Sequence, residues 1–428
     1  MQIFDVVIVG ARCAGSPLAV SLARRGLSVC VVDKAHFPSE TPSTHVIQPR
    51  GAAALDRIGA LNAVRAVGAA TIDRFTMVNE DVRIEDVFDT AWFPLPGLCV
   101  RRVTLDSVLV DTAAAAGADV RTGVKVTGLI SADGRIAGVD TEHGPIHARL
   151  VVGADGRHSS VAKFVGAKEY SITPMGRLPV WGYYEGVGDR GGLKVARLGE
   201  NAYLASPTDS GLYMVCLAAG GDHRGEAFDA GVADWPELAD LLAGARRTGP
   251  LRVMAKWHGY LRQSAGPGWV LIGDAGHFKD FTPGQGIADA LAQAERLADM
   301  LPADLTDHRA VDAVTQRWWQ WRDHDAYAMH WFATDMGAPG PATALITEVL
   351  RDIAGDADGR RTLMQVLNHD VSPKQLLTPR RLAVATAATL RRRPRRLRAT
   401  GREIAAAAGN EIRRTRSSRR TPPGMHTR

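Results

Sequence analysis

The sequence predicts an α/β fold: a parallel-sheet domain, a separate antiparallel sheet inserted into it, and a C-terminal helical region. Residues 3–9, IFDVVIV, are a short apolar run rich in β-branched residues, which is typical of a strand buried on both faces of a parallel sheet. Residues 171–260 contain successive strand-like stretches such as VWGYYEG and LYMVCLAAG, which indicate the antiparallel sheet. Residues 310–336 have the periodicity of a long helix.

The first 33 residues have the order strand, glycine-rich turn, helix, strand, acid. The strand at 3–9 is followed by GARCAG at 10–15, by apolar residues at helical spacing, and by SVCVVD, which ends in Asp33. This is the context of a Rossmann-like dinucleotide-binding loop. Gly10 permits the turn, Gly15 lets helix and strand pack closely, and the helix N-terminus faces a pyrophosphate. Asp33 is then placed to accept hydrogen bonds from a ribose.

Arg12 stands where this motif usually has its middle glycine. That glycine lets the backbone approach the phosphates. An arginine is compatible with a bound nucleotide if its side chain points outward or along the phosphate edge. From the sequence alone, we expect that glycine at position 12 would leave the nucleotide bound, because it restores the usual loop.

The remaining elements follow in order. Residues 51–70 have helical periodicity, residues 71–96 alternate like strands, and residues 104–116 form a helix that Gly117 ends. Short strands between residues 118 and 155 predict a three-stranded meander, which a nicotinamide-only domain rarely contains. A buried strand at 268–272 leads into the loop GDAGHFKDFTPGQG and a long helix, IADALAQAERLADML.

The composition is that of an ordinary globular protein, with 45% hydrophobic and 23% charged residues. We expect no signal peptide, no membrane-spanning segment and a cytoplasmic location. The cysteines lack metal-ligand spacing, so we expect reduced thiols and no metal site. They are Cys13, Cys30, Cys99 and Cys216.

The net charge of +6 comes from the C-terminal end. From Arg380 onward there are 15 arginines against Glu403 and Glu411, which leaves the rest of the chain mildly acidic. One interpretation of this basic tail is a partly disordered, solubilising extension. The alternative is a segment that contacts acidic surfaces such as membrane lipid or nucleic acid. No specific nucleic-acid site is predicted.

Three separated motifs carry a family resemblance. The first is the unit from Gly10 to Asp33, the second is VVGADGRHSSVAKFVG at 151–166, and the third is GDAGHFKDFTPGQGI at 273–287. In this order they resemble the FAD-dependent class A flavoprotein monooxygenase superfamily, with its geranylgeranyl-reductase-like and halogenase-like relatives. The likeness covers roughly residues 1–300. It implies a Rossmann-like FAD-binding domain of the GR2 type and a substrate domain built on the antiparallel sheet.

The resemblance divides the chain into seven segments. The FAD-binding domain is expected at 1–75, 97–170 and 261–305, the substrate domain at 76–96 and 171–260, the C-terminal helical region at 306–372, and the basic tail at 373–428.

The resemblance also implies non-covalent FAD and its contacts. Asp274 binds the ribityl chain, and residues 282–287 surround the pyrimidine end of the flavin. Arg102 reaches the phosphates, and Val126 contacts adenine. The full set of expected FAD-binding residues is Gly10, Ala11, Arg12, Ala14, Gly15, Asp33, Lys34, Arg50, Arg102, Val126, Asp155, Gly156, Gly273, Asp274, Pro283, Gly284, Gly286 and Ile287.

The catalytic candidates lie in the loop after Asp274 and around His45. Phe281 is expected to form an apolar wall of the substrate site, where many aromatic hydroxylases have a proline. Asp280, held by Lys279 or His277, is expected to orient the substrate or a proton. His45 and His277 are further titratable candidates, and each is equally well explained as a structural residue.

The reaction implied is that of an NAD(P)H-dependent monooxygenase acting on a small aromatic or polyketide-like substrate in secondary metabolism. NAD(P)H, or a flavin reductase, supplies electrons, and O2 adds at flavin C4a before one oxygen atom is transferred. Three alternatives remain open: a flavin-dependent C=C reductase, a halogenase, and a non-catalytic flavin-binding regulator. The halogenase alternative is weakened because the chain lacks the tryptophan-halogenase WxWxIP signature.

Overall fold

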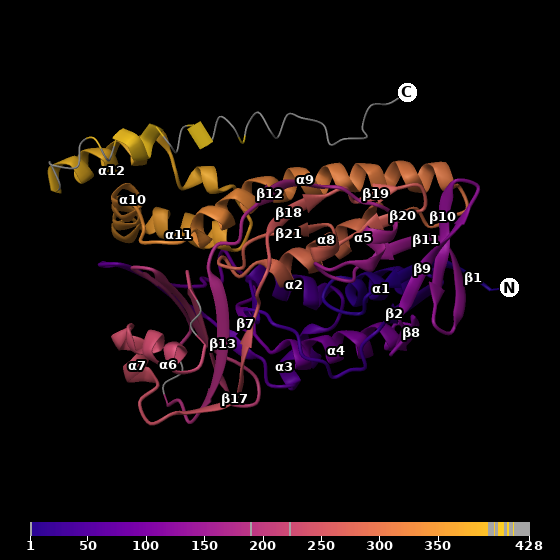
Figure 1. Ribbon diagram of the computed structural model, residues 1–428, viewed down its shortest axis with the longest axis horizontal. Coiled ribbons are helices and arrows are strands. Elements are labelled where there is room, and N and C mark those ends of the chain that lie inside the picture. The colour runs from indigo at the N-terminus through magenta and orange to yellow at the C-terminus, as the bar shows by residue number, and fades with distance from the viewer. Residues whose placement is uncertain are drawn as a thin grey trace.

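The computed structural model describes residues 2–188, 191–221, 224–392, 398, 401–405, 409–410 and 414. Two large sheets organise the chain, and a long helix runs beside the first of them (Figure 1). Within the described residues, no helix combines the length and apolarity needed to cross a bilayer.

The first sheet is mainly parallel and contains the N-terminal strand at its centre. Its order is β19-β20-β11-β1-β2-β8, with β10 and β9 added antiparallel to β11. The central strands are buried on both faces, as the apolar run at 3–9 predicted. The strands are β1 (Ile3–Val9), β2 (Val29–Asp33), β8 (Asp119–Thr122), β9 (Val126–Ala132), β10 (Arg135–Thr141), β11 (Gly144–Gly153), β19 (Ala265–Gly266) and β20 (Trp269–Leu271).

Helices from distant parts of the chain pack together with this sheet. α1 contacts both α4 and α8, and α2 also packs on α8. The region 51–70, predicted as one helix, is two helices, because the chain turns at Gly59 with φ of +69°. The helices are α1 (Gly15–Arg24), α2 (Pro49–Arg57), α3 (Leu61–Ala66), α4 (Arg102–Ala115), α5 (Ser160–Phe164) and α8 (Gly286–Met300).

The second sheet is the predicted antiparallel one and has the order β17-β13-β16-β15-β14-β5-β6. One pairing, β14 with β5, is parallel, and it joins residues 74–87 to the later strands. Helices α6 (Glu226–Ala233) and α7 (Pro236–Leu241) cover one face. The strands are β5 (Arg74–Asn79), β6 (Val82–Val87), β13 (Leu178–Glu185), β14 (Leu193–Leu198), β15 (Asn201–Pro207), β16 (Tyr213–Ala219) and β17 (Arg246–Val253).

Two small sheets join the large ones. In the first, β18 lies between β12 and β21, and in the second, β7 lies between β3 and β4. A short 3-10 helix, η1, leads from β20 to β21. These elements are β3 (Val46–Ile47), β4 (Ala70–Ile72), β7 (Gly97–Cys99), β12 (Glu169–Thr173), β18 (Gly259–Arg262), β21 (His277–Phe278) and η1 (Gly273–Ala275).

The C-terminal region is helical, as predicted. α9 runs along the parallel-sheet domain beside α8, and α10 to α12 lie at the same end of the molecule as the antiparallel sheet (Figure 1). The tryptophans of α9 pack onto the body: Trp318 donates to the Gln293 carbonyl and Trp319 to the Tyr170 hydroxyl. The elements are α9 (His308–Gly337), α10 (Ala344–Gly355), α11 (Ala357–Leu367), η2 (Pro373–Gln375) and α12 (Pro379–Arg392).

The start of the predicted basic tail is a folded part of the body, which corrects its boundary at residue 373. α12 packs on α10 and buries Ala385 and Thr389. Arg381 joins the two by ion pairs with Asp352 and Asp356. The sequence concealed this because alternating arginines and small residues resemble a solvated extension. Most of the tail beyond Arg392 lies outside the described residues.

We expect a chain that ends at Thr378 to be less heat-stable than one that ends at Arg392. Removing α12 exposes the apolar side of α10, and each lost kcal/mol lowers Tm by roughly 2 °C or less in a chain of this length. Differential scanning calorimetry of the two truncated chains measures this. Equal Tm values would show that α12 contributes nothing to the body.

Candidate functional site

The first motif forms a tight turn between β1 and α1. Gly10 has a φ of +106°, and a Cβ there would overlap the carbonyl of Ala154. A Cβ on Gly15 would overlap the carbonyl of Gly10. Both positions therefore require glycine, and the turn places the N-terminus of α1 at the carboxyl edge of the parallel sheet, where such folds bind nucleotides.

Asp33 closes this turn through both of its carboxylate oxygens. Oδ2 accepts a hydrogen bond from the Ala11 amide at 2.8 Å, and Oδ1 accepts one from the Ala35 amide at 2.8 Å. Each oxygen keeps a second lone pair for a ribose hydroxyl. Val124 donates its amide to the Asp33 carbonyl, which brings the strand of Val126 to the same edge, while Lys34 is exposed.

Arg12 does not open the loop to solvent. Its Nη1 donates to the Asp106 carboxylate at 2.7 Å, and its Nη2 donates to the Ser39 hydroxyl at 2.9 Å. Arg102, at the start of α4, donates to the same carboxylate through Nε and Nη2 at 2.9 and 3.0 Å. Two guanidinium groups from separate segments of the chain therefore share one fully buried carboxylate.

The middle motif follows β11 and begins α5. Asp155 Oδ2 accepts hydrogen bonds from the amides of Ser160 and Val161, at 2.6 and 3.3 Å. Its Oδ1 is buried and has no hydrogen-bond partner among the described residues. Burial raises the pKa of Asp155. Gly156 has a φ of +75°, which lets the chain leave the strand sharply.

The third motif places Asp274 in η1, immediately after the buried strand β20. Burial raises the pKa of the Asp274 carboxyl to about 6, although the Arg102 cation lowers it. Among the described residues, none donates a hydrogen bond to this carboxylate, so it has acceptor capacity for hydroxyl groups. A Cβ on Gly273, whose φ is +57°, would press on Ala14 of the first motif. The first and third motifs are therefore in contact.

These features fit FAD. The acceptor oxygens of Asp155 and Asp274 and the cations of Arg12 and Arg102 form one polar site along the edge of the sheet. In bound FAD, the Asp274 carboxylate would accept hydrogen bonds from ribityl hydroxyls, and Asp155, Arg12 and Arg102 would lie on the pyrophosphate side. The first turns of α1 and α8 add backbone amides at Ala14, Gly286 and Ile287.

Lys279 is fixed by a buried ion pair. Its Nζ contacts the Asp289 carboxylate at 2.5 Å and the Gln285 side-chain oxygen at 2.7 Å. Asp289 also accepts from His369 Nδ1 at 2.9 Å. Burial raises the pKa of Asp289, but Lys279 and His369 outweigh it and hold the pKa well below its usual range. Lys279 therefore locks the loop to α8 and to the end of α11.

Asp280 points elsewhere, so the expectation that Lys279 or His277 holds it is wrong. Its Oδ1 accepts from the Thr282 amide at 2.9 Å and from the Thr282 hydroxyl at 2.5 Å. A Cβ on Gly176 or on Gly337 would collide with the carboxylate. Adjacent residues of an extended chain face opposite sides, which separates Asp280 from Lys279. Burial raises the pKa of Asp280 to about 6.

Phe281 lies against two buried indoles of the antiparallel-sheet side. Its ring centroid is 6.2 Å from that of Trp181 on β13 and 5.9 Å from that of Trp257, both edge-on. Arg177 lies immediately before β13 and acts electrostatically on Asp280. No local motif in the sequence marks Arg177, Trp181 or Trp257, because only the tertiary fold brings them to the loop.

The remaining candidates from the sequence are His45, His277 and Arg50. His45, with φ of +60°, contacts the Tyr183 hydroxyl through Nε2 at 2.6 Å, and burial lowers its pKa to about 3. His277 is buried beside His330, and its pKa is well below the usual range because of burial. Arg50 donates to the His369 carbonyl and faces Asp325. Its contact with FAD stays a prediction that no described interaction supports.

Pro283 and Gly284 complete the loop before α8. The Pro283 carbonyl accepts from Gln48 Nε2 at 3.2 Å, and Gly284 has a φ of +64°. Gln285 donates to the carbonyls of Val366 and Leu367, so the C-terminal helices also brace this loop.

The comparisons with known proteins agree with this geometry. Residues 4–184 match the family described as FAD binding domain. The chain is 29% identical over 343 residues to 6-methylpretetramide 4-monooxygenase of Streptomyces rimosus, covering 73% of this chain and 79% of that protein. It is 28% identical over 344 residues to menaquinone reductase of Mycolicibacterium smegmatis, covering 72% and 78%. A flavin-dependent brominase superposes with a TM-score of 0.72 at 18% identity, covering 92% of this chain and 100% of that chain.

The chain contains an FAD binding domain over residues 4–184 and is a flavin-dependent oxidoreductase. The matched domain includes the first two motifs, and the two sequence matches cover 79% and 78% of those relatives. These relatives are a monooxygenase and a reductase, so the likeness alone leaves the reaction of this flavoenzyme open.

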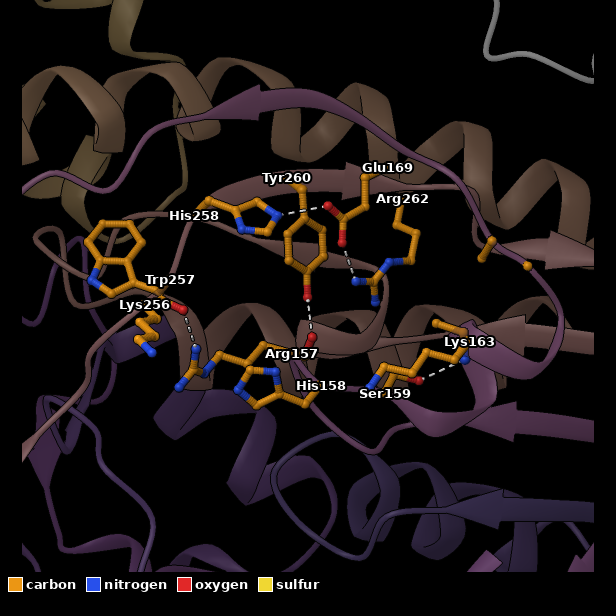
Figure 2. A pocket seen from close by; sticks show the side chains of 13 residues that line it. Arg157, His158, Ser159, Lys163, Glu169, Lys256, Trp257, His258, Tyr260 and Arg262 are labelled. Atoms are coloured by element: carbon orange, nitrogen blue, oxygen red, sulfur yellow. Dashed lines mark hydrogen bonds and ion pairs between the residues drawn. The ribbon is translucent and has the colours of Figure 1, made fainter. Parts of the chain in front are cut away.

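A cationic cavity of about 430 Å³ opens beside the middle motif of the flavoenzyme (Figure 2). Glu169 lies between His258 and Arg262 and pairs with both. The cations of Arg157, Lys163 and Lys256 have no carboxylate partner among the described residues, so the cavity carries a positive surplus. Tyr260 donates its hydroxyl to the carbonyls of Arg157 and Asp274, so the cavity adjoins the FAD site. Trp257 lines the cavity and also contacts Phe281.

We expect Asp274→Ala to weaken FAD binding severely. The substitution removes acceptors for several ribityl hydrogen bonds, each worth roughly 0.5–1.5 kcal/mol. Flavin fluorescence titration of the apoprotein measures the change, and Asp73→Ala on an exposed loop is the control. FAD bound with unchanged affinity would show that this carboxylate does not contact the cofactor.

We expect Asp280→Asn to stabilise the fold at pH 8 but not at pH 4. The folded-state pKa of about 6 lies above the ordinary value of 3.8, so the folded protein binds this proton more tightly than the unfolded chain. The free energy of unfolding therefore falls as the pH rises from the unfolded-state pKa of 3.8 through the folded-state pKa of about 6, by up to roughly 3 kcal/mol. Asparagine keeps the acceptor for Thr282 and removes the charge. Urea unfolding at both pH values measures the difference, and an equal effect at both would contradict it.

Proposed function

We propose that this flavoenzyme is an NAD(P)H-dependent monooxygenase that inserts one oxygen atom from O2 into a small ring compound bearing hydroxyl or carbonyl groups. The observation that carries the proposal is the ionisable, desolvated carboxylate of Asp280 beside an aromatic, donor-rich site. Reduced FAD supplies electrons to O2 and so provides the electrophilic oxygen. The protein's residues bind and orient the ring and move its proton.

The aromatic residues suit a flat substrate. Phe281, Trp181 and Trp257 present rings edge-on to one another, and such rings bind planar molecules through stacked or edge contacts. The relative from Streptomyces rimosus is named as a monooxygenase of 6-methylpretetramide. A small aromatic or polyketide-like ring compound is therefore the substrate class we propose.

Unpaired donors favour an oxygen-bearing ring over an isoprenoid chain. Arg177 Nη1, Trp181 Nε1 and Trp257 Nε1 are buried and have no hydrogen-bond partner among the described residues. An unsatisfied buried donor costs roughly 1–3 kcal/mol. A substrate with hydroxyl or carbonyl oxygens would satisfy such donors, whereas the hydrocarbon chain of a prenyl substrate would not. This supports oxygenation over C=C reduction.

Asp280 is the group we assign to proton transfer. A carboxyl with a pKa of about 6 is mostly ionised at pH 7 yet holds a proton far better than an ordinary aspartate. Accepting the proton of a ring hydroxyl makes the ring electron-rich, which favours attack on an electrophilic oxygen. The Arg177 cation can then stabilise the phenolate.

The cationic cavity is the site we assign to the electron donor. Its three unneutralised cations suit the phosphate groups of NADPH or NADH, and its contact with the FAD site through Tyr260 suits hydride delivery. Supply of electrons by a separate flavin reductase is the alternative. Flavin reduction by NAD(P)H under anaerobic conditions distinguishes the two.

We expect Asp280→Asn to separate flavin reduction from substrate oxygenation. The variant should keep the wild-type flavin spectrum and the rate of anaerobic reduction by NAD(P)H, because Asp280 is not among the FAD ligands. It should lose most product and release the consumed oxygen as peroxide, because the ring is no longer deprotonated. Stopped-flow spectroscopy, a peroxide assay and product analysis measure these three quantities.

A panel of phenolic, polyketide and prenylated compounds provides the substrates, with Asp73→Asn as the control variant. Product formation by Asp280→Asn at the wild-type rate and coupling would remove Asp280 from the reaction. Anaerobic reduction of a prenyl double bond by the wild-type protein, without oxygenated product, would favour the C=C reductase instead. A flavin that neither NAD(P)H nor a flavin reductase reduces, whichever compound is present, would favour a non-catalytic regulator.

A further inference from the structure

Asp106 accepts hydrogen bonds from the side chains of Arg12, Arg102 and Cys13, which belong to the segments expected to lie near the FAD phosphates. Arg12 Nη1 donates to its Oδ2 at 2.7 Å, and Arg102 donates to both of its oxygens at 2.9 and 3.0 Å. Cys13 Sγ donates to Oδ1 at 3.4 Å. The Asp106 side chain is fully buried, so solvent does not compete for these contacts. A carboxylate engaged in this way has no role as a direct ligand.

We infer that Asp106 is a positioning residue that holds Arg12 and Arg102 together as a two-arginine clamp for the diphosphate of FAD. The inference rests on FAD binding and is independent of the reaction that the enzyme performs. One carboxylate neutralises one of the two guanidinium charges, and the remaining positive charge meets a dianionic diphosphate. Without Asp106, two cations this close would repel each other and separate.

The clamp accounts for arginine in place of the usual middle glycine. A Cβ at position 12 hinders the close backbone approach that glycine allows, and the guanidinium supplies charge-assisted hydrogen bonds in its place. The revised expectation is therefore that glycine at position 12 weakens FAD binding. The contact between Arg12 and Asp106 joins residues 94 positions apart in sequence, which is why the sequence alone favoured tolerance.

Arg12 also ties the following loop to the clamp. Its Nη2 donates to the Ser39 hydroxyl at 2.9 Å, and its guanidinium lies 5.1 Å from the centre of the Phe37 ring. Arg102 connects the clamp to the third motif, because it is the cation that most strongly favours the ionised form of Asp274. The clamp thus lies between the loop after β2 and the third motif, along the path of an extended dinucleotide.

The test compares ligands with and without a diphosphate on the flavin-free protein. Isothermal titration with ADP and with adenosine, and fluorescence titration with FAD, give three affinities for each of Arg12→Gly, Arg12→Lys and Asp106→Asn. We expect Arg12→Gly and Asp106→Asn to weaken ADP and FAD by ~10-fold or more, as for loss of charge-assisted contacts, and to leave adenosine unchanged. Arg12→Lys should retain part of the affinity, because it keeps the charge without the planar fork.

Two further measurements complete the experiment. In the double variant the losses should not add, because both substitutions dismantle one clamp. Arg57→Ala, which breaks a surface ion pair with Glu295, is the control and should bind all three ligands normally. If Asp106→Asn does not fold, the two Arg12 variants decide.

Wild-type affinity of Arg12→Gly for ADP and FAD would overturn the inference. An equal loss for adenosine and ADP would also overturn it, because the loop itself would then be damaged. None of these affinities involves turnover, so the result does not depend on whether the protein is a monooxygenase.

Discussion

The buried ion pair of Lys279 with Asp289 is the contact on which the site depends. It links the loop after β21 to α8, and through His369 it reaches the end of α11. Separating such a pair would leave an uncompensated charge in the interior, which costs about 3–5 kcal/mol. The loop that carries Asp280 and Phe281 is therefore fixed by two side chains, Asp289 and His369, that follow Lys279 by ten and 90 residues.

This anchoring gives neighbouring residues opposite environments. Lys279 is held by a carboxylate, so its charge is compensated where it lies. Asp280 faces Gly176, Gly337 and Thr282, and burial there raises its pKa. The protein thereby keeps one carboxyl group near its titration point at neutral pH while the adjacent ammonium group is structural. Separation of roles by local environment is a general way to tune acid–base groups.

Two sites of different chemistry meet at Trp257. On one side lies the cationic cavity beside the middle motif, and on the other lies the ring of Phe281. Tyr260 connects the same cavity to Asp274 through backbone carbonyls. In the reaction we propose, the charged electron donor and the flat substrate therefore approach the FAD site from separate directions.

The sequence by itself determined the parallel-sheet domain, the FAD motifs and the position of the antiparallel sheet. Gly10, Gly15 and Asp33 act within one local unit, so their spacing along the chain is enough to identify them. Only the tertiary structure decided which side chains meet across units: Arg12 with Asp106, Lys279 with Asp289, and Phe281 with Trp181 and Trp257. It also decided that α12 belongs to the body. These contacts depend on sheet register and helix packing, and a chain's local periodicity carries no information about which distant partner a side chain will face.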